Sequence, residues 1–236
     1  MSDGYFELAS LEHFWVKRRF EVLRKLAEDL VTRAGEIAEI GCGQGLLQRQ
    51  IEETYGRTVT GFDLNEHGLK HNLSQCSRVI CYDVFQRTAE FEQRFDLIFL
   101  WDVLEHLGNE DSFLQAVRFH LARGGDLVFN VPAGEWAFSG YDIAAGHFRR
   151  YSERSFLSVM QRNGLQVTKW TYWGLPLMPT LLFRRLFLSR KGIHERHYSR
   201  GFGAGNRIVN EMLGVVARLE MTPQKIGGTS LMAVVR

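Results

Sequence analysis

The sequence predicts an α/β fold in which a parallel sheet carries helices on both of its faces. Strand-like and helix-like segments alternate from residue 36 to about residue 173. The strand-like segments are apolar runs without regular polar alternation, as expected of strands buried on both faces. Such alternation is typical of parallel strands joined by crossover helices. With 236 residues, the chain is long enough for one large domain with a substantial core.

The first half of the chain opens with a helix and then alternates between strands and helices. Residues 11–34 repeat apolar side chains at helical spacing, so we expect a helix there. The elements that follow, in chain order, are a strand at 36–41, a helix at 46–55, a strand at 57–63, a helix at 65–73 capped by Asn65, a strand at 77–83 and a strand at 94–103.

The second half continues in this way up to residue 173, and residues 174–227 then hold two predicted helices that break the alternation. The regular elements are a helix at 110–125 ended by Gly124 and Gly125, a strand at 126–132, a helix at 152–164 capped by Ser152, and strands at 165–173 and 229–236. We therefore predict one domain with four parts: an N-terminal helical cap (1–34), a core that binds the ligand (35–173), a helical lid insertion (174–227) and the last strand (228–236).

The composition excludes several classes of protein. The formal net charge of +2 gives no field that favours nucleic acid. The three cysteines form no CxxC pair, which indicates reduced thiols in a reducing compartment. The first residues do not resemble a signal peptide, and the apolar stretch 175–188 is interrupted by proline and arginine. A spanning helix needs about 20 apolar residues, so we expect a cytoplasmic protein.

Three glycines, Gly41, Gly43 and Gly45, lie between the first predicted strand and the next helix. In an open α/β sheet this turn holds the ligand, although a glycine-rich turn without a ligand is the alternative. Leu46 stands where a dinucleotide fingerprint needs glycine, and no Gly-Lys-Ser/Thr ending follows, so the loop is not built for phosphates. Glu39, just before the first glycine, favours a ligand that carries a cation.

Two further acidic residues end the next two predicted strands. Asp63 stands about 20 residues after the glycines, where a carboxylate accepts hydrogen bonds from ribose hydroxyls. Asp83 is placed to accept the amine of adenine, with Val84 covering the ring. Together these residues predict a nucleoside that bears a cation and no phosphates, which fits S-adenosylmethionine.

The stretch 39–45, Asp63, Asp83 and "WDVLEHL" (101–107) resemble the successive motifs of class I S-adenosylmethionine-dependent methyltransferases, and most of all the group with ubiquinone-biosynthesis O-methyltransferases. The resemblance covers about residues 36–131. It implies a Rossmann-like seven-stranded sheet in the order 3-2-1-4-5-7-6 with strand 7 antiparallel. It also implies cofactor contacts from Cys42, Leu64 and Trp101. The stretches 13–20, 146–152 and the closing "GTSLMAVVR" resemble one bacterial branch of this family.

The acceptor site is expected on the loops after the fourth and fifth strands. His106 is either a general base or a histidine that orders its loop. His147 is the first candidate for the base, because the nearby Asp142 can fix its tautomer and raise its basicity. Arg149 and Arg150 are either an anion clamp beside a Tyr151 wall or ion pairs that hold the loop to the sheet.

The N-terminal helix and the insertion offer two candidate covers for the site. Trp15 and Arg18 lie three residues apart and share a helix face. In one interpretation Trp15 is a lid over the substrate and Arg18 binds the methionyl carboxylate of the cofactor. In the other, Trp15 packs the helix against the core and Arg18 lies in water. Residues 175–200 form either a packed lid or a basic amphipathic helix that contacts a membrane or a lipid-linked acceptor. Neither the His67/His71 pair nor "HERH" (194–197) has supporting ligands, so we expect no metal site.

The sequence thus predicts methyl transfer from S-adenosylmethionine, with S-adenosylhomocysteine as product, to a small-molecule acceptor and not to nucleic acid. O-methylation of an anionic, phenolic, sugar-like or lipid-linked acceptor is the first hypothesis, because bases are near. N-methylation of a small amine and a non-catalytic cofactor-binding subunit are the alternatives. An aminopropyl transferase is disfavoured by the basic loop 142–151, and a nicotinamide oxidoreductase by Leu46.

Overall fold

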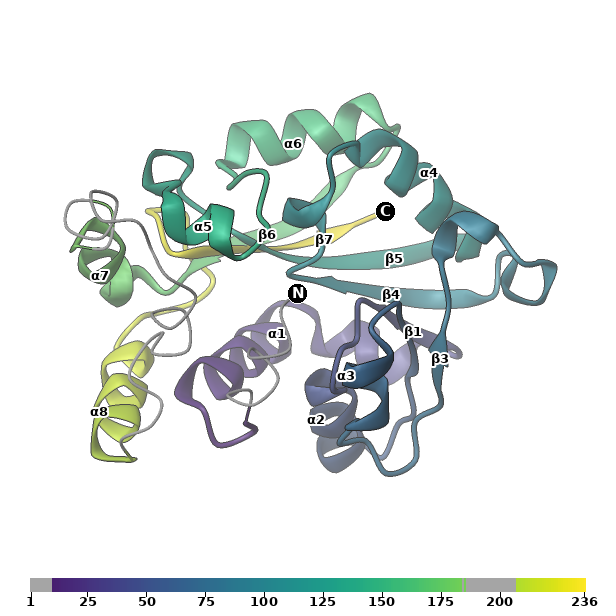
Figure 1. Cartoon of the computed structure of the whole chain (residues 1–236), viewed down its shortest axis with the longest axis horizontal. Helices are drawn as coiled ribbons and strands as arrows, with labels where there is room; N and C mark the ends of the chain where they lie inside the picture. Colours follow the sequence, from purple (N-terminus) through teal and green to yellow (C-terminus); the bar gives the residue numbers. More distant parts are fainter. Residues whose placement is uncertain (1–9, 184, 186–206) are drawn as a thin grey trace.

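The computed structural model describes residues 10–183, 185 and 207–236. Its centre is a seven-stranded sheet in the order β3-β2-β1-β4-β5-β7-β6 (Figure 1). β7 runs antiparallel to both of its neighbours, and the other paired strands are parallel. This order confirms the predicted topology. The strands are β1 (Ile37–Ile40), β2 (Thr60–Asp63), β3 (Val79–Cys81), β4 (Phe95–Trp101), β5 (Leu121–Pro132), β6 (Val167–Trp173) and β7 (Ser230–Val235).

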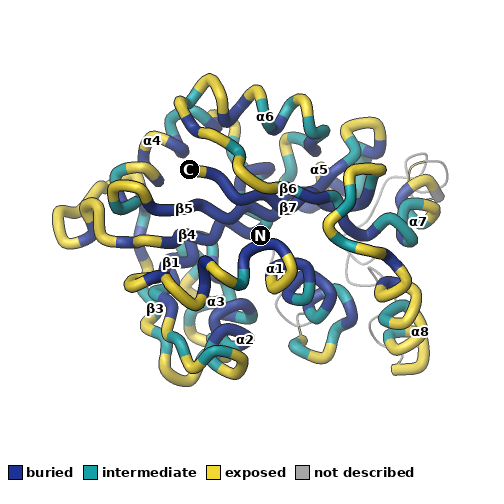
Figure 2. The backbone as a smooth tube through the Cα atoms, turned by 180° about the vertical axis from the view of Figure 1, so that it is seen from behind, coloured by how far each residue is buried: buried dark blue, intermediate teal, exposed yellow. Residues whose placement is uncertain are grey.

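Helices cover both faces of this sheet. In Figure 1, α1, α2 and α3 lie on one side of it, and α4 and α6 lie on the other. Two apolar clusters fill the space between the layers, one under α1 and α2 and one under α4 and α6. Figure 2 shows the strands buried and the outer turns of the helices exposed. The helices are α1 (Phe14–Arg33), α2 (Leu46–Tyr55), α3 (Glu66–Lys70), α4 (Glu110–His120), α5 (Gly140–Ala144), α6 (Glu153–Arg162), α7 (Met178–Phe183) and α8 (Arg207–Arg218).

Local capping fixes where several of these helices begin. The Asn65 side chain accepts a hydrogen bond from the Gly68 amide at 3.0 Å and caps α3. Ser152 accepts from the Ser155 amide at 3.2 Å while the Ser155 hydroxyl accepts from the Ser152 amide at 3.0 Å, a capping box that starts α6. Both caps were predicted from the sequence.

The helix α4 ends at His120, whereas the sequence predicted a helix over 110–125. Leu121 is already extended and pairs with Phe95 of β4. The amides of Gln93 and Arg94 donate to the carbonyls of Phe119 and His120, at 2.8 and 3.0 Å. These contacts satisfy the last carbonyls of the helix, so the chain turns into β5 before it reaches Gly124.

Part of the predicted insertion lies within the described residues. α7 and α8 fall between β6 and β7, and α8 packs along α1, where the Asn210 side chain accepts from the Phe14 amide at 2.9 Å. The basic stretch predicted at 175–200 and the "HERH" histidines lie largely or wholly outside the described residues. Across the described part of the chain, none of the helices has the length and apolar character needed to span a membrane.

Candidate active site

The turn between β1 and α2 is built on glycine because two side chains press against it. Gly41 has φ +80°, and a Cβ there would lie 2.5 Å from a methyl carbon of Val103. Gly45 has φ +70°, and a Cβ there would lie 2.4 Å from the Asn72 amide. The amides of Gly41 and Cys42 both donate to the Phe62 carbonyl, at 2.7 and 3.1 Å, so the turn folds back onto β2. A residue with a side chain would be strained at these positions and would clash with these neighbours.

A cleft of about 690 Å³ opens beside this turn. Asp63 lines this cleft, and its carboxylate accepts hydrogen bonds from the Gly43 amide at 2.7 Å and from the Asn65 amide at 2.8 Å. Leu64 stands at the rim with 67% of its surface exposed and offers an apolar face. The volume is within the range of small-molecule sites. The residues that line the cleft are Gly41, Gly43, Asp63, Leu64, Asn65, Glu66, Asp102, Val103, His106 and Leu107.

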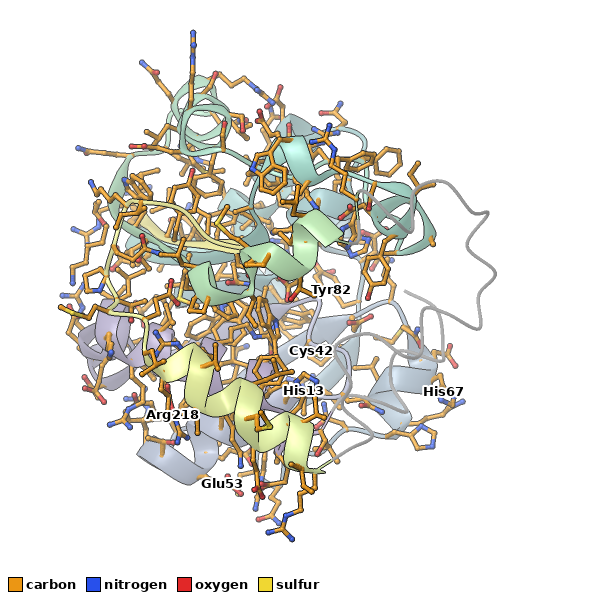
Figure 3. The ribbon with its side chains drawn as sticks, turned by 90° about the vertical axis from the view of Figure 1, so that its left-hand side faces the viewer. His13, Cys42, Glu53, His67, Tyr82 and Arg218 are labelled. Carbon is orange, nitrogen blue, oxygen red and sulfur yellow. The ribbon has the colours of Figure 1, made fainter. Side chains whose placement is uncertain are left out.

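Glu39 lies buried behind the glycine turn. Its Oε2 atom has no hydrogen-bond partner among the described residues. Burial, with a smaller contribution from Asp63, raises the pKa of Glu39 to about 8, although the charge of Arg19 opposes the rise. An unpartnered buried carboxyl group fits a ligand that brings a positive charge, as the sequence predicted. Cys42, labelled in Figure 3, is also buried, and burial strongly raises the pKa of its thiol, which therefore stays neutral.

A chain of polar contacts holds the turn after β4. Arg19 donates to Asp102 at 2.5 Å and lies over the Trp101 ring, 4.5 Å from its centroid. The Asn130 side-chain nitrogen Nδ2 donates to the other Asp102 oxygen at 2.7 Å, and Trp173 Nε1 donates to the Asn130 side-chain oxygen Oδ1 at 2.9 Å. Asp102 has φ +54°, a conformation that these partners support. Trp101 was predicted from the sequence, whereas Arg19, Asp102 and Asn130 were not predicted as site residues.

The predicted acceptor residues His147 and Asp142 come together beside His106, which lines the cleft. His147 Nδ1 lies 3.2 Å from the Asp142 carboxylate, and His106 Nδ1 lies 3.1 Å from the Gly146 carbonyl. The two imidazoles meet edge to face, with centroids 4.7 Å apart. Burial and the neighbouring His147 lower the pKa of His106. Burial alone would raise the pKa of Asp142, but the hydrogen bond from His147 and the charge of Arg150 outweigh it and hold that pKa below its usual range.

Glu105, also missed by the sequence analysis, belongs to this group. It is 1% exposed, and burial, with the charge of Asp102, raises its pKa well above the usual range. One ligand atom each of Glu105, His106 and His147 lies within 4.8 Å of the other two. Glu105 directly precedes His106 in the stretch "WDVLEHL" (101–107), and this position could have indicated it as a site residue.

The structure corrects the prediction for the N-terminal helix. Arg18 points away from the glycine turn, because it pairs with Glu220 at 3.6 Å and Glu21 at 3.2 Å and donates to the Glu220 carbonyl at 2.9 Å. Trp15 stacks on Trp173 with centroids 4.2 Å apart and packs against the core. Neither residue lines the cleft, so the lid and the carboxylate clamp are wrong for these side chains. Arg19, one residue on, contacts Asp102 of the cleft lining instead.

The structure also corrects the predicted anion clamp. Arg149 pairs with Glu110 at 2.6 Å and donates to the Leu107 carbonyl at 3.0 Å. Arg150 donates to Asp142 at 2.7 Å and to the Ala133 carbonyl at 3.1 Å. Tyr151 is buried, and its hydroxyl donates to Glu110 at 2.6 Å. All three side chains have protein partners, so they hold the loop to the sheet, which was the alternative interpretation.

Asp83 and Val84 lie beyond the cleft lining. The Asp83 carboxylate accepts from the Phe85 amide at 3.0 Å and caps the 3₁₀ turn Val84–Gln86, while Val84 packs into the core. Trp101 is likewise buried. The Arg19 guanidinium lies over its ring and pairs with Asp102 of the cleft lining. Their predicted contacts with a cofactor stay predictions.

Comparison with known proteins gives the family. A family model described as a methyltransferase domain matches residues 15–169. A ubiquinone biosynthesis O-methyltransferase of Coxiella burnetii is 27% identical over 115 residues, 46% of this chain and 48% of that protein. One of Pseudomonas putida is 28% identical over 187 residues, 67% of this chain and 80% of that protein. The chain spans about half the length of the first of these relatives.

Solved structures share the fold. A SAM-dependent methyltransferase from Archaeoglobus fulgidus has a TM-score of 0.59 at 15% identity, over 92% of this chain and 93% of that one. An S-adenosylmethionine-dependent methyltransferase from Mesorhizobium loti has a TM-score of 0.58 at 14% identity, over 97% of this chain and 98% of that one. The domain match covers well over half of the chain, which therefore belongs to the methyltransferase-domain family, as the resemblance to S-adenosylmethionine-dependent methyltransferases predicted.

Proposed function

We propose that this chain transfers the methyl group of S-adenosylmethionine to a hydroxyl oxygen of a small-molecule acceptor held beside His106 and His147. The observation that carries the proposal is the edge-to-face contact of these two imidazoles, of which His106 lines the cleft beside the turn 41–45, here termed the glycine cleft. Both Nδ1 atoms face oxygen acceptors, so in a neutral ring the proton resides on Nδ1 and the Nε2 lone pair is free for other contacts.

The cleft residues suit the donor. Asp63 stands where ribose hydroxyls need acceptors, Leu64 offers an apolar cover for the adenine ring, and Glu39 lacks a cationic partner. When bound, S-adenosylmethionine supplies a methyl group on a positively charged sulfur, and that sulfur keeps the electron pair of the bond that breaks. The protein's task is then to align the acceptor and to exclude water.

The acceptor hydroxyl must lose its proton as its oxygen bonds to the methyl carbon. His106 lines the cleft, and its lowered pKa keeps the imidazole neutral near pH 7, ready to receive that proton. His147 packs edge-on against it and is oriented by Asp142. An amine acceptor would need no base, so this pair favours O-methylation over N-methylation.

The surroundings favour an acceptor with an apolar or aromatic body. Ile143 and Phe148, on either side of His147 in the chain, are 66% and 62% exposed. Arg149 and Arg150 are engaged in ion pairs, which removes the anion clamp that would favour an anionic acceptor. A phenolic acceptor, with or without a lipid tail, fits best, and the relatives named as ubiquinone biosynthesis O-methyltransferases support this choice.

A screen of phenols, catechols, sugars and amines for release of S-adenosylhomocysteine tests the proposal. We expect turnover with a phenolic hydroxyl, and loss of about 10²–10⁴-fold in kcat for His106→Gln with unchanged cofactor affinity. His147→Gln should also lose kcat, through the orientation of the pair. Full turnover in both variants, or turnover with amines alone, contradicts the proposal.

A further inference from the structure

Glu105, His106 and His147, here termed the acceptor triad, come from two loops that are tied together at the cleft. Glu105 and His106 belong to the 3₁₀ turn Leu104–His106 after β4, and His147 follows α5. The Phe148 amide donates to the Glu105 carbonyl at 2.8 Å, and His106 Nδ1 faces the Gly146 carbonyl at 3.1 Å. The ligand atoms of the triad lie within 4.8 Å of one another as a consequence of this pairing.

The two imidazoles of the triad have their second nitrogens free for a ligand. A carbonyl or carboxylate oxygen can only accept, so Nδ1 donates in both neutral rings and each Nε2 keeps its lone pair. A histidine that binds a metal through one nitrogen almost always donates its other N–H to a carboxylate or a carbonyl. His147 with Asp142 and His106 with Gly146 both show this pattern.

The third side chain, Glu105, is buried without a hydrogen-bond partner for its Oε2 atom in the described part of the chain. Glu105 is 1% exposed, and its Oε2 makes no hydrogen bond to any described residue. Burying a carboxylate without a hydrogen-bond partner is costly, and nearby Asp102 adds a second negative charge, which the charges of Arg150 and Arg19 offset only in part, since the pKa of Glu105 stays well above its usual range. A divalent cation between Glu105 and the two Nε2 atoms would supply the missing charge.

The support behind the triad is rigid. Asp142 is fully buried and is held by Arg150 at 2.7 Å, by the Ser139 amide at 3.0 Å and by His147. Such a fixed carboxylate sets the tautomer and the direction of the His147 ring. It therefore orients one ligand before any ion arrives.

We propose that Glu105, His106 and His147 bind one divalent transition-metal ion at the acceptor end of the cleft. Two imidazoles and one carboxylate suit Zn²⁺ first and Mn²⁺ or Fe²⁺ next. Three protein ligands leave a position open, and His106 borders the cleft, so that position is available to an acceptor oxygen.

This role rests on the proposed function for the nature of the acceptor, and it replaces the base role of His106 whenever the ion is bound. A nitrogen that binds the ion does not accept a proton at the same time. With the ion present, the acceptor hydroxyl is made acidic by the cation and gives its proton to solvent, and the imidazoles serve as ligands.

Zn²⁺ binding to the full chain, purified without a histidine tag and stripped with EDTA, tests the proposal. Calorimetry and elemental analysis after dialysis should give one Zn²⁺ per chain. Glu105→Gln and His106→Asn should each weaken binding tenfold or more. The matched control is His71→Ala, which breaks the exposed pair of His71 with His67 (His67 is labelled in Figure 3) and should leave that Zn²⁺ in place.

Co²⁺ gives a second measurement with its own signature. Its visible absorption in the wild type should report a low-coordinate site with nitrogen and oxygen ligands, and this band should be lost in Glu105→Gln and in His106→Asn. Circular dichroism checks that each variant is folded, and because the half-exposed His106 is the milder site to change, a misfolded Glu105→Gln still leaves the proposal testable.

Each outcome decides the matter. No Zn²⁺ bound to the wild type, or Zn²⁺ lost in His71→Ala and kept in His106→Asn, overturns the metal site. If S-adenosylhomocysteine binds while Zn²⁺ does not, the metal site fails and the proposed function stands. If S-adenosylhomocysteine does not bind, the proposed function fails whatever the metal does.

Discussion

Arg19 of α1 and Asp102 of the turn after β4 form an ion pair of 2.5 Å at the edge of the glycine cleft. The pair joins residues 83 positions apart and ties the N-terminal helix to the loop that lines the site. Its neighbour Arg18 is turned the other way, to Glu220. Two consecutive arginines therefore have different tasks, one at the site and one in the packing of the helix.

We expect replacement of Arg19 to lower the affinity for S-adenosylhomocysteine, and replacement of Arg18 to lower only the free energy of unfolding. Arg19→Ala removes the cationic partner of Asp102 and leaves it the hydrogen bond from Asn130, and we expect S-adenosylhomocysteine binding to fall about tenfold with a loss of about 1–3 kcal/mol in stability. Arg18→Ala removes the ion pair of the buried Glu220, whose carboxylate keeps its hydrogen bonds from the Gly174 and Leu175 amides and from Gln224. We expect a cost of about 2–3 kcal/mol while affinity stays near the wild-type value. Calorimetry and urea unfolding measure both, and equal losses of affinity in the two variants would contradict the assignment.

The glycine turn gives a second pair of matched variants. Gly41→Ala places a methyl group 2.5 Å from Val103 in a left-handed conformation, so S-adenosylhomocysteine binding should be lost together with about 2 kcal/mol or more of stability. Gly56→Ala, with φ +61° and open space around it, carries only the conformational cost of about 1–2 kcal/mol. Binding that survives in Gly41→Ala would show that the turn does not shape the site.

Glu39 makes the free protein less stable as the pH rises. Its pKa of about 8 in the folded chain exceeds the usual 4.5, so between these values the folded state holds a proton that the unfolded state has released. The resulting penalty grows from about pH 4.5 and levels off above pH 8, at most about 4–5 kcal/mol. Glu39→Gln should therefore gain stability over the wild type as the pH rises from 5 to 8.5. Denaturation curves across this range that stay parallel for the two proteins would refute the account.

Tyr151 tests the correction made to the predicted substrate wall. Tyr151→Phe removes the hydrogen bond to Glu110, which keeps its pairs with Arg149 and Arg162. We expect a loss of about 1–2 kcal/mol in unfolding free energy and no change in KM for the acceptor. A raised KM with unchanged stability would return Tyr151 to the acceptor site.

Most of the fold was predictable because it depends on local patterns. Helix α2 begins and ends at the predicted residues, and Asn65 and Ser152 cap the helices they were expected to cap. The order of the strands came from the family resemblance, which periodicity could not have supplied. The early end of α4 was missed because it depends on pairing between Leu121 and Phe95, a contact distant in sequence.

The site was predictable where residues follow a strand, and less so elsewhere. Asp63, His106, Gly41 and Gly43 line the cleft, whereas Gly45 does not. Helical spacing put Trp15 and Arg18 on one face, but it could not show that this face meets Trp173 and Glu220, more than 150 residues away. The arginines of the 146–152 loop found buried acids as partners, and a sequence without contacts does not reveal such pairs.

The central claim is that a phosphate-free adenosyl group binds in the cleft between the glycine turn and Asp63, and titration with S-adenosylhomocysteine tests it most directly. The account predicts one site of micromolar affinity in the wild type, strongly weakened in Asp63→Ala, and no binding of NADH. Equal affinity in the variant, or a chain that takes up NADH and ignores S-adenosylhomocysteine, would contradict it.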